Sequence, residues 1–407
     1  MKILFADNSL WAQLNFRGSI ITHLRDVGHE VVMVSPIDAQ SQEIVIPDRI
    51  RHIAIEMRRT STNPLHDILY FFRLMSIYWK ERPDYIFHFT IKPNIYGTLA
   101  AHLLSIHCTA MVAGLGFTFS HTGLASKMAH RLFRLGLSFS DKIMVLNEEN
   151  RRILMEQGMA RKKQLVLLEG GEGVDLDKYS FSDNRADKTI FLMVARVLYD
   201  KGYEEVVEAA KIVKRTHPEV EVQLLGPVDE AYPNAVSREQ IRKDEESGAI
   251  TYLGYTTEPA KLMGRPGISL LLSSYHEGLN RSLMEGCALG KPIIASDIPG
   301  CRETVREGEN GYLVPPKDVN ALADAMLRYL SLSDEEKESM SINSRRLAEE
   351  RFDIKYVKSC YERILQEYDS DKRRKERSHV KASPKRRLFL FPETLHYVSY
   401  RLCITED

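Results

Sequence analysis

The sequence predicts an α/β fold of two domains, each built from alternating strands and helices. Its 407 residues exceed the length of one typical domain. Short apolar runs alternate with helical patterns over residues 2–168, and the alternation starts again at residue 189. Between them, the glycines of residues 169–175 and the polar residues 180–188 interrupt regular structure. This order is typical of two parallel sheets that carry helices on their faces.

The composition excludes several classes of protein. Hydrophobic residues make up 43% and charged residues 28% of the chain, and no apolar run approaches the roughly 18 residues of a membrane span, so we expect folding in water. Lys plus Arg and Asp plus Glu both total 56, which gives no reason to expect a nucleic-acid partner. The five cysteines are scattered without C-x-x-C spacing, and the chain starts as a strand rather than a signal peptide. Both observations favour the cytoplasm, with neither disulfides nor a zinc site.

The first half opens like a nucleotide-binding strand–helix–strand unit, but no G-x-G-x-x-G follows the first strand. A dinucleotide dehydrogenase is therefore disfavoured. Apolar runs predict strands at residues 2–6, 30–35, 85–89, 109–112, 142–146 and 164–168. Helical patterns cover residues 18–27, 67–80 and 126–138. The last of these is basic and amphipathic, which suits either an anionic lipid surface or an ordinary solvated face.

The second half repeats the alternation. Strands are predicted at residues 189–194, 220–225, 250–253, 268–272 and 292–296. Helices are predicted at residues 203–215, 281–289, 320–332 and 334–368. The intervening residues 227–248 contain proline, asparagine and a charge run, and we expect them to be an irregular, solvated segment.

Two carboxylates stand out between the predicted strands of the second half. Glu277 follows one strand in a loop, and Glu285 lies early in a helix that Asn280 can cap. Both face the carboxyl ends of the strands, where open α/β sheets bind ligands, and the helix N-terminus there attracts phosphate. The alternative is a pair of solvated glutamates on an ordinary strand–helix–strand unit.

The pattern around these glutamates resembles the nucleotide-sugar site of the family 4 retaining glycosyltransferases. That pattern is carried here, in order, by Glu277, Glu285, Gly290, Pro292, Gly300, Glu303 and Gly311. Residues 195–202, ARVLYDKG, match the family's G/A-R-x4-K-G pattern, and Gly173-Val174-Asp175 matches its G-V-D segment. The resemblance covers roughly residues 1–368.

The resemblance implies two Rossmann-like α/β domains that face each other across a cleft, the GT-B arrangement. The first, residues 1–175, would be the acceptor side, and the second, residues 185–352, would bind the nucleotide sugar. Residues 353–370 would form a helix that crosses back to the first domain. The tail, residues 371–407, lies outside the resemblance; its basic and aromatic residues suit either a disordered segment or an anionic membrane surface.

Donor-site roles follow from the same resemblance. Glu285 would hold the ribose hydroxyls and Glu277 the hydroxyls of the donor sugar. Arg196 and Lys201 would stabilise the departing diphosphate, as fixed cations stabilise an oxyanion. The remaining donor-side residues are Gly278, the backbone N–H groups of Leu279 and Asn280, Tyr255 near the base, and Gly18. Relatives carry a Gly-rich turn at the position of Gly18, and Arg17 beside it would add a positive charge. The alternative for Gly18 is relief of crowding at a helix start.

The acceptor side is less defined. The segment FHFTIKPNIYG resembles bacterial polysaccharide members of the family, so His88 and Lys92 become candidates to face the cleft. A lone histidine on an apolar strand is more often a core residue. Relatives place a sugar-contacting histidine in the loop that here contains Gly114 and Gly116, which leaves the choice between His88 and His121 open.

The expected activity is metal-independent, cofactor-independent and retaining transfer of a hexose or N-acetylhexosamine, with a UDP-sugar as the donor. The expected acceptor is a lipid-linked saccharide, and the expected location is the cytoplasm, peripheral to the membrane. Two alternatives stay open: a nucleotide-sugar epimerase of similar fold, and a non-catalytic scaffold of a polysaccharide assembly complex.

Overall fold

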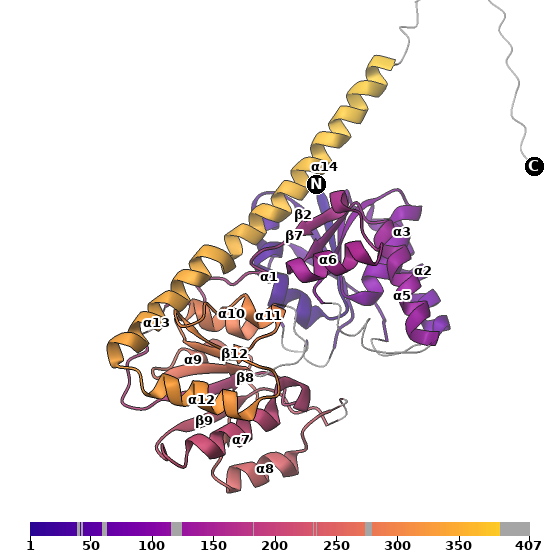
Figure 1. The fold of residues 1–407 in the computed structure, drawn as a ribbon. Helices are drawn as coiled ribbons and strands as arrows, with labels where there is room; N and C mark the ends of the chain where they lie inside the picture. Colours follow the sequence, from indigo (N-terminus) through magenta and orange to yellow (C-terminus); the bar gives the residue numbers. More distant parts are fainter. Residues whose placement is uncertain are drawn as a thin grey trace, which may run out of the picture. The chain divides into compact units, whose positions relative to one another are not determined.

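The computed structural model describes residues 1–38, 41, 44–58, 63–114, 124–181, 183–230, 232, 234–272 and 279–382. One compact unit, Met1–Glu362, contains two parallel sheets with helices packed around them (Figure 1). The two-sheet α/β fold predicted from the sequence is confirmed. No helix in the described ranges is long and apolar enough to cross a bilayer.

The first sheet has seven parallel strands in the order β3-β2-β1-β4-β5-β6-β7. Their bounds are β1 (Lys2–Ala6), β2 (Glu30–Ser35), β3 (Ile50–Ala54), β4 (Tyr85–Phe89), β5 (His107–Val112), β6 (Lys142–Val145) and β7 (Leu165–Leu167). The chain winds outward from β1 in one direction and then from β4 in the other. The carboxyl ends of these two strands therefore border the crevice where such sheets bind ligands.

The second sheet has six parallel strands in the order β10-β9-β8-β11-β12-β13, with the same reversal between β8 and β11. Their bounds are β8 (Ile190–Val194), β9 (Glu221–Leu225), β10 (Thr251–Tyr252), β11 (Ile268–Leu272), β12 (Ile293–Ser296) and β13 (Gly311–Val314). Its core is apolar, with Phe191 and Val222 of the central strands fully buried beside helices α7 (Tyr203–Val213) and α12 (Val319–Leu330).

The other helices of the first half are α1 (Leu10–Asp26), α2 (Pro64–Glu81), the π-helix η2 (Pro93–Gly97), α3 (Thr98–Leu103), α5 (Leu124–Ser138), α6 (Glu148–Glu156) and the 3₁₀ turn η3 (Lys162–Gln164). Those of the second half are the 3₁₀ turn η4 (Tyr199–Lys201), α8 (Arg238–Glu246), α9 (Pro259–Met263), α10 (Arg281–Ala288), α11 (Pro299–Arg302), α13 (Asp334–Leu347), the π-helix η5 (Ala348–Phe352) and α14 (Ile354–Ala382).

Three element predictions were wrong. Helix α1 begins at Leu10 rather than at residue 18, because Ser9 caps it by accepting from the N–H of Ala12. Residues 227–248 contain helix α8, which Ser237 caps and which buries Ile241. The predicted single helix 334–368 is three segments, and its last segment continues through the basic residues to Ala382.

The first turns of α14 pack on the first sheet, although they follow the second sheet in the chain. The Tyr361 ring lies 4.7 Å from the ring of Phe87 on β4 and 6.2 Å from that of Phe5 on β1. Glu362 pairs with His23 of α1 at 2.8 Å. These contacts join the two ends of the compact unit.

Candidate active site

Two cations sit together where strand β8 ends. Arg196 is the second residue after the strand, and Lys201 closes the short turn η4 before helix α7. Gly202 begins that helix with a φ of 83°, a backbone conformation that favours glycine. Burial, together with the positive charge of Arg196, lowers the pKa of Lys201 to about 8 from its usual 10.5. Burying a lysine next to another cation is unfavourable in the absence of a ligand. Such an arrangement is typical of a site whose ligand brings negative charge.

The N-terminus of helix α10 lies beside these cations. Asn280 caps the helix by accepting from the N–H of Leu283 at 3.0 Å. The Ser282 hydroxyl donates to the carbonyl of Val194, the last residue of β8, at 2.8 Å. The same strand end therefore carries Arg196 and anchors the first turn of α10. The positive end of a helix and two cations thus meet at one strand end.

Backbone contacts correct part of the donor-site prediction. The N–H of Asn280 donates to the carbonyl of Gly300 at 3.4 Å, so this group already has an acceptor. Leu279 is buried against Gly171, where a Cβ would come within 2.5 Å of the leucine side chain. Gly171 also has a φ of +60°, so this close approach requires glycine.

Glu285 is buried on helix α10 and is held in place by two neighbours. Its carboxylate accepts from Arg281 Nε at 2.8 Å. The second neighbour is Tyr179. Burial raises the pKa of Tyr179 above its usual value, and the negative charge of Glu285 adds to that rise. A carboxylate offers about four acceptor positions, so Glu285 can still accept from a further pair of hydroxyls.

Arg281 and Tyr179 line a cavity of about 590 Å³ that also borders helix α1. The Arg281 guanidinium lies 5.0 Å from the ring centre of Phe16 on α1, so side chains of both halves form the wall. Gly18 lies in the middle of α1 and lines the same cavity. Gly18 therefore lies inside a helix, neither in a Gly-rich turn nor at a helix start.

Arg17 does not offer its charge to a donor. Its buried guanidinium lies 3.0 Å from Asp7, 2.5 Å from Glu172, and 4.2 Å from the ring centre of Phe89. Burial lowers the pKa of Arg17, but the charges of Glu172 and Asp7 outweigh this effect and raise it. The positive charge of Arg17, expected to lie beside the donor, is thus neutralised by Asp7 and Glu172 inside the protein.

His88 does not face a cleft as predicted, and Lys92 is held by an ion pair. His88 is 0% exposed, and its Nε2 lies 3.0 Å from the hydroxyl of Tyr78, so it is a core residue. Burial lowers the pKa of His88 to about 3, which leaves the ring neutral at physiological pH. Lys92 is mostly buried and pairs with Asp67 of α2 at 2.6 Å.

Four predicted site residues lie outside the described ranges: Glu277, Gly278, Gly116 and His121. Gly114 is described and is exposed just beyond the end of β5. Tyr255 is half exposed three residues after β10 and follows Gly254, whose φ is +77°.

Sequence reasoning missed Tyr232 and Arg281. Tyr232 lies in the segment between β9 and α8, and its ring centre is 4.4 Å from the guanidinium carbon of Arg196. Nothing in the local sequence pointed to this contact. Arg281 precedes Glu285 by four residues, the spacing at which helical side chains pair, so its ion pair was predictable.

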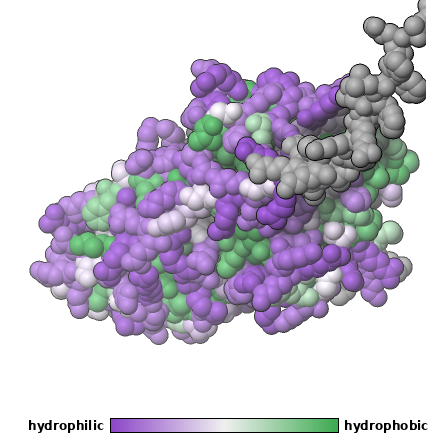
Figure 2. Space-filling model, turned by 90° about the horizontal axis from the view of Figure 1, so that it is seen from above, coloured by the Kyte–Doolittle hydropathy of each residue, from purple (hydrophilic) through white to green (hydrophobic). Residues whose placement is uncertain are grey.

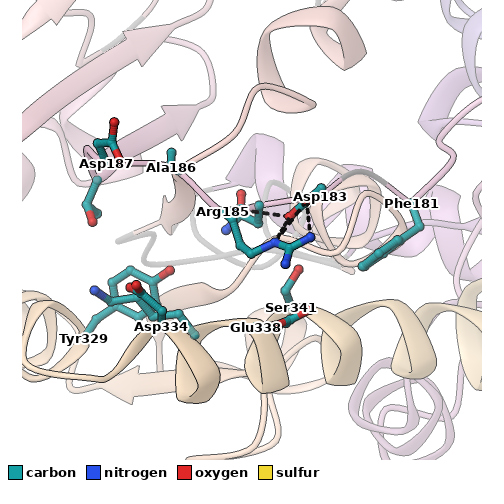
Figure 3. Close-up of a pocket in the computed structure, with 13 residues that line it drawn as sticks. Phe181, Asp183, Arg185, Ala186, Asp187, Tyr329, Asp334, Glu338 and Ser341 are labelled. Atoms are coloured by element: carbon teal, nitrogen blue, oxygen red, sulfur yellow. Dashed lines mark hydrogen bonds and ion pairs between the residues drawn. The ribbon is translucent and has the colours of Figure 1, made fainter.

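A second cavity, of about 430 Å³, lies between the segment that contains Asp183 and Arg185 and helices α12 and α13 (Figure 3). Arg185 and Asp183, which both line this cavity, form an ion pair at 2.8 Å. Its described lining contains none of the predicted donor-site residues. The candidate active site is therefore the end of strand β8 together with the N-terminus of helix α10.

Comparison with protein-family models identifies the class of protein. The model for glycosyl transferases group 1 matches residues 177–347, and the model for glycosyl transferase 4-like proteins matches residues 2–147. The matches coincide with the second and the first sheet. The chain therefore belongs to this family of GT-B glycosyltransferases, and it is a glycosyltransferase.

Curated relatives match along most of the chain. An N,N'-diacetylbacillosaminyl-diphospho-undecaprenol α-1,3-N-acetylgalactosaminyltransferase of Campylobacter jejuni is 29% identical over 353 residues, which cover 82% of this chain and 90% of that protein. The capsular polysaccharide biosynthesis glycosyltransferase CapM of Staphylococcus aureus is 19% identical, covering 74% and 82%. A UDP-Gal:α-D-GlcNAc-diphosphoundecaprenol α-1,3-galactosyltransferase of Escherichia coli is 21% identical, covering 70% and 76%.

Solved structures share the fold. Sucrose-phosphate synthase from Thermosynechococcus elongatus superposes with a TM-score of 0.76 at 19% identity, covering 91% of this chain and 100% of that one. Anabaena HepE in complex with UDP gives a TM-score of 0.74 at 18% identity, covering 90% and 100%. At these identities the likeness supports the GT-B fold alone.

Proposed function

We propose that this glycosyltransferase moves a hexose or N-acetylhexosamine from a UDP-sugar to a lipid-linked saccharide, with retention of configuration, in cell-surface polysaccharide synthesis. The UDP-sugar part of this proposal rests on one observation: the cations Arg196 and Lys201 lie together beside the N-terminus of helix α10. Two cations and a helix N-terminus suit a diphosphate better than any neutral ligand.

The proposed mechanism uses these groups in the transition state. As the bond between the sugar and the diphosphate breaks, negative charge grows on the leaving diphosphate, and Arg196 and Lys201 stabilise it. This role is often filled by a divalent cation, so two fixed cations support a metal-independent reaction. Glu285, oriented by Arg281, accepts from the ribose hydroxyls, and Glu277 would hold the donor sugar. The leaving phosphate would help to deprotonate the acceptor, which accounts for retention without a separate protein base.

The relatives support the acceptor half. The Campylobacter and Escherichia relatives carry names that specify sugars linked to undecaprenol through a diphosphate. We therefore assign a polyprenyl-diphosphate saccharide as the acceptor class. Such an acceptor is anchored in a membrane, so the enzyme must work as a peripheral protein at a lipid surface.

The test is a panel of radiolabelled nucleotide sugars incubated with the protein, with and without membrane lipid extract. Label that moves into lipid supports the transferase. A changed donor without an acceptor supports an epimerase, and donor that stays intact supports a scaffold.

Site variants connect the reaction to the geometry. Arg196→Ala should lower the transfer rate on the order of 10²-fold, as loss of an oxyanion-stabilising donor does. Glu285→Ala should abolish nucleotide affinity in calorimetry while circular dichroism stays native. The matched control is Arg185→Ala, which removes an exposed arginine of the second cavity. Normal transfer by Arg196→Ala would contradict the diphosphate assignment.

A further inference from the structure

Helix α2 exposes an apolar stripe to solvent. Leu65, Ile68, Leu69, Phe72 and Trp79 all lie on its outer face, at spacings of three, four and seven residues, and Leu65 and Trp79 are 72% and 63% exposed. An ordinary surface helix turns its apolar stripe inward and its charges outward. Large exposed apolar stripes mark interaction sites.

Helix α5 combines an apolar stripe with a basic one. Its exposed apolar side chains are Met128, Leu132 and Leu135. Its exposed basic side chains, each next to one of these in sequence, are Lys127, Arg131 and Arg134. The helix contains no Asp or Glu from Leu124 to Ser138. Cations beside exposed apolar groups, without acids, suit an anionic lipid surface.

The two helices flank the same structural element. Helices α2 and α5 both contact η2 and α3. Gly136 lets α5 approach closely, because a Cβ there would lie 2.7 Å from the backbone oxygen of Asn94 in η2. Leu103 of α3 adds an apolar side chain that is 60% exposed. Hydrophobic patches lie among hydrophilic surface on the face of the molecule seen in Figure 2.

We propose that the outer faces of α2, α3 and α5 form one docking surface for an anionic lipid bilayer. The apolar side chains would enter the interface, and the basic side chains of α5 would meet the headgroups. The three helices all belong to the first half of the chain, which is the proposed acceptor side. The inference rests on the proposed lipid-linked acceptor for its biological purpose, while the binding itself can be measured without any acceptor.

A bilayer fits this surface better than a second copy of the chain. A symmetric pairing through α5 would bring basic residues of two copies together with no acid on that helix to compensate, which is unfavourable. An anionic bilayer accommodates both stripes at once.

The test is flotation of the full-length protein with phosphatidylcholine vesicles, with and without phosphatidylglycerol. Arg131→Gln/Arg134→Gln should lower partitioning to the anionic vesicles by roughly 30-fold and leave binding to neutral vesicles unchanged. Phe72→Ser/Trp79→Ser should lower partitioning to both vesicle types by at least about tenfold.

Three controls locate the effect. Ile342→Ser removes an isolated exposed apolar residue of α13, and Arg152→Gln removes an ion-paired surface arginine of α6. Both should partition like the unmodified chain. Lys385→Gln/Arg386→Gln/Arg387→Gln tests the basic tail. If only the tail variant loses binding, or if Phe72→Ser/Trp79→Ser abolishes a dimer in sedimentation velocity without changing flotation, the proposed surface is wrong.

Failure of docking and failure of the proposed function are distinguishable. The docking variants should still transfer sugar to a short-chain, water-soluble diphosphate acceptor, because they leave the donor site untouched. Vesicle binding without transfer to any acceptor would refute the proposed function and leave the docking surface standing. Normal vesicle binding by both helix variants would refute the docking surface alone.

Discussion

Donor affinity should fall as pH rises through the pKa of Lys201. That pKa is lowered to about 8 by burial and by the charge of Arg196. The free site is therefore about 90% charged at pH 7 and about 10% charged at pH 9. Only the charged form pairs with a diphosphate, so the bound diphosphate raises the pKa of Lys201 and binding takes up a proton. Affinity should drop about tenfold from pH 7 to pH 9.

The assay is calorimetry with the nucleotide sugar that the donor panel selects. The two phosphates of a nucleotide sugar are both esterified and do not titrate between pH 7 and pH 9. Binding at pH 8 should also take up protons, measured as a dependence of the heat on the ionisation enthalpy of the buffer. Lys201→Arg carries a charge that does not titrate near neutrality and should bind equally well at pH 7 and pH 9.

Two results would refute this reasoning. One is an affinity of the unmodified protein that does not change between pH 7 and pH 9. The other is the same tenfold drop in Lys201→Arg, which would place the titrating group elsewhere or on the nucleotide itself.

Three further predictions concern contacts that the sequence did not reveal. Tyr232→Phe should keep the catalytic rate, whereas Tyr232→Leu should lower it about two- to fivefold, because the ring face positions Arg196; steady-state kinetics that show equal rates would contradict this. Glu172→Gln leaves the buried Arg17 with one acidic partner and should reduce the unfolding free energy by about 3 kcal/mol in urea titration. Gly136→Ala should cost about 1–3 kcal/mol, seen as a lower Tm, because its Cβ would meet a backbone oxygen of η2; an unchanged Tm would show that η2 moves freely.

Central strands were predictable because parallel strands are buried on both faces and are recognisable as apolar runs. The predictions at residues 30–35, 85–89 and 268–272 agree with the structure to the residue. Strand β3 was missed because Arg51 and His52 interrupt its apolar pattern, which an edge strand with one neighbour tolerates. Helix α8 was missed because its cap, Ser237, lies within a charge run that we interpreted as solvated.

Side-chain direction was much less predictable than element position. His88 follows an apolar pattern that predicts burial, but the sequence does not show that its ring would form a hydrogen bond with the hydroxyl of Tyr78. Lys92 looked available at a strand end until its partner Asp67 was known. Both partners lie on α2, so only the packing of that helix against β4 and η2 decides these contacts.

The donor side was more predictable than the acceptor side for a physical reason. Arg196 and Lys201 lie within one short loop, whose position is fixed by the strand before it and the helix after it. The first half gives no such local rule: Arg17, a cation beside the end of β1, is neutralised by Asp7 and by Glu172, which comes from a segment far along the chain. Because the charge of Arg17 is already paired, we expect the cations Arg196 and Lys201 of the second half to meet the negative charge of the proposed donor. The affinity for a diphosphate should therefore respond to Lys201 and Arg196 and be insensitive to the electrostatics of the first sheet.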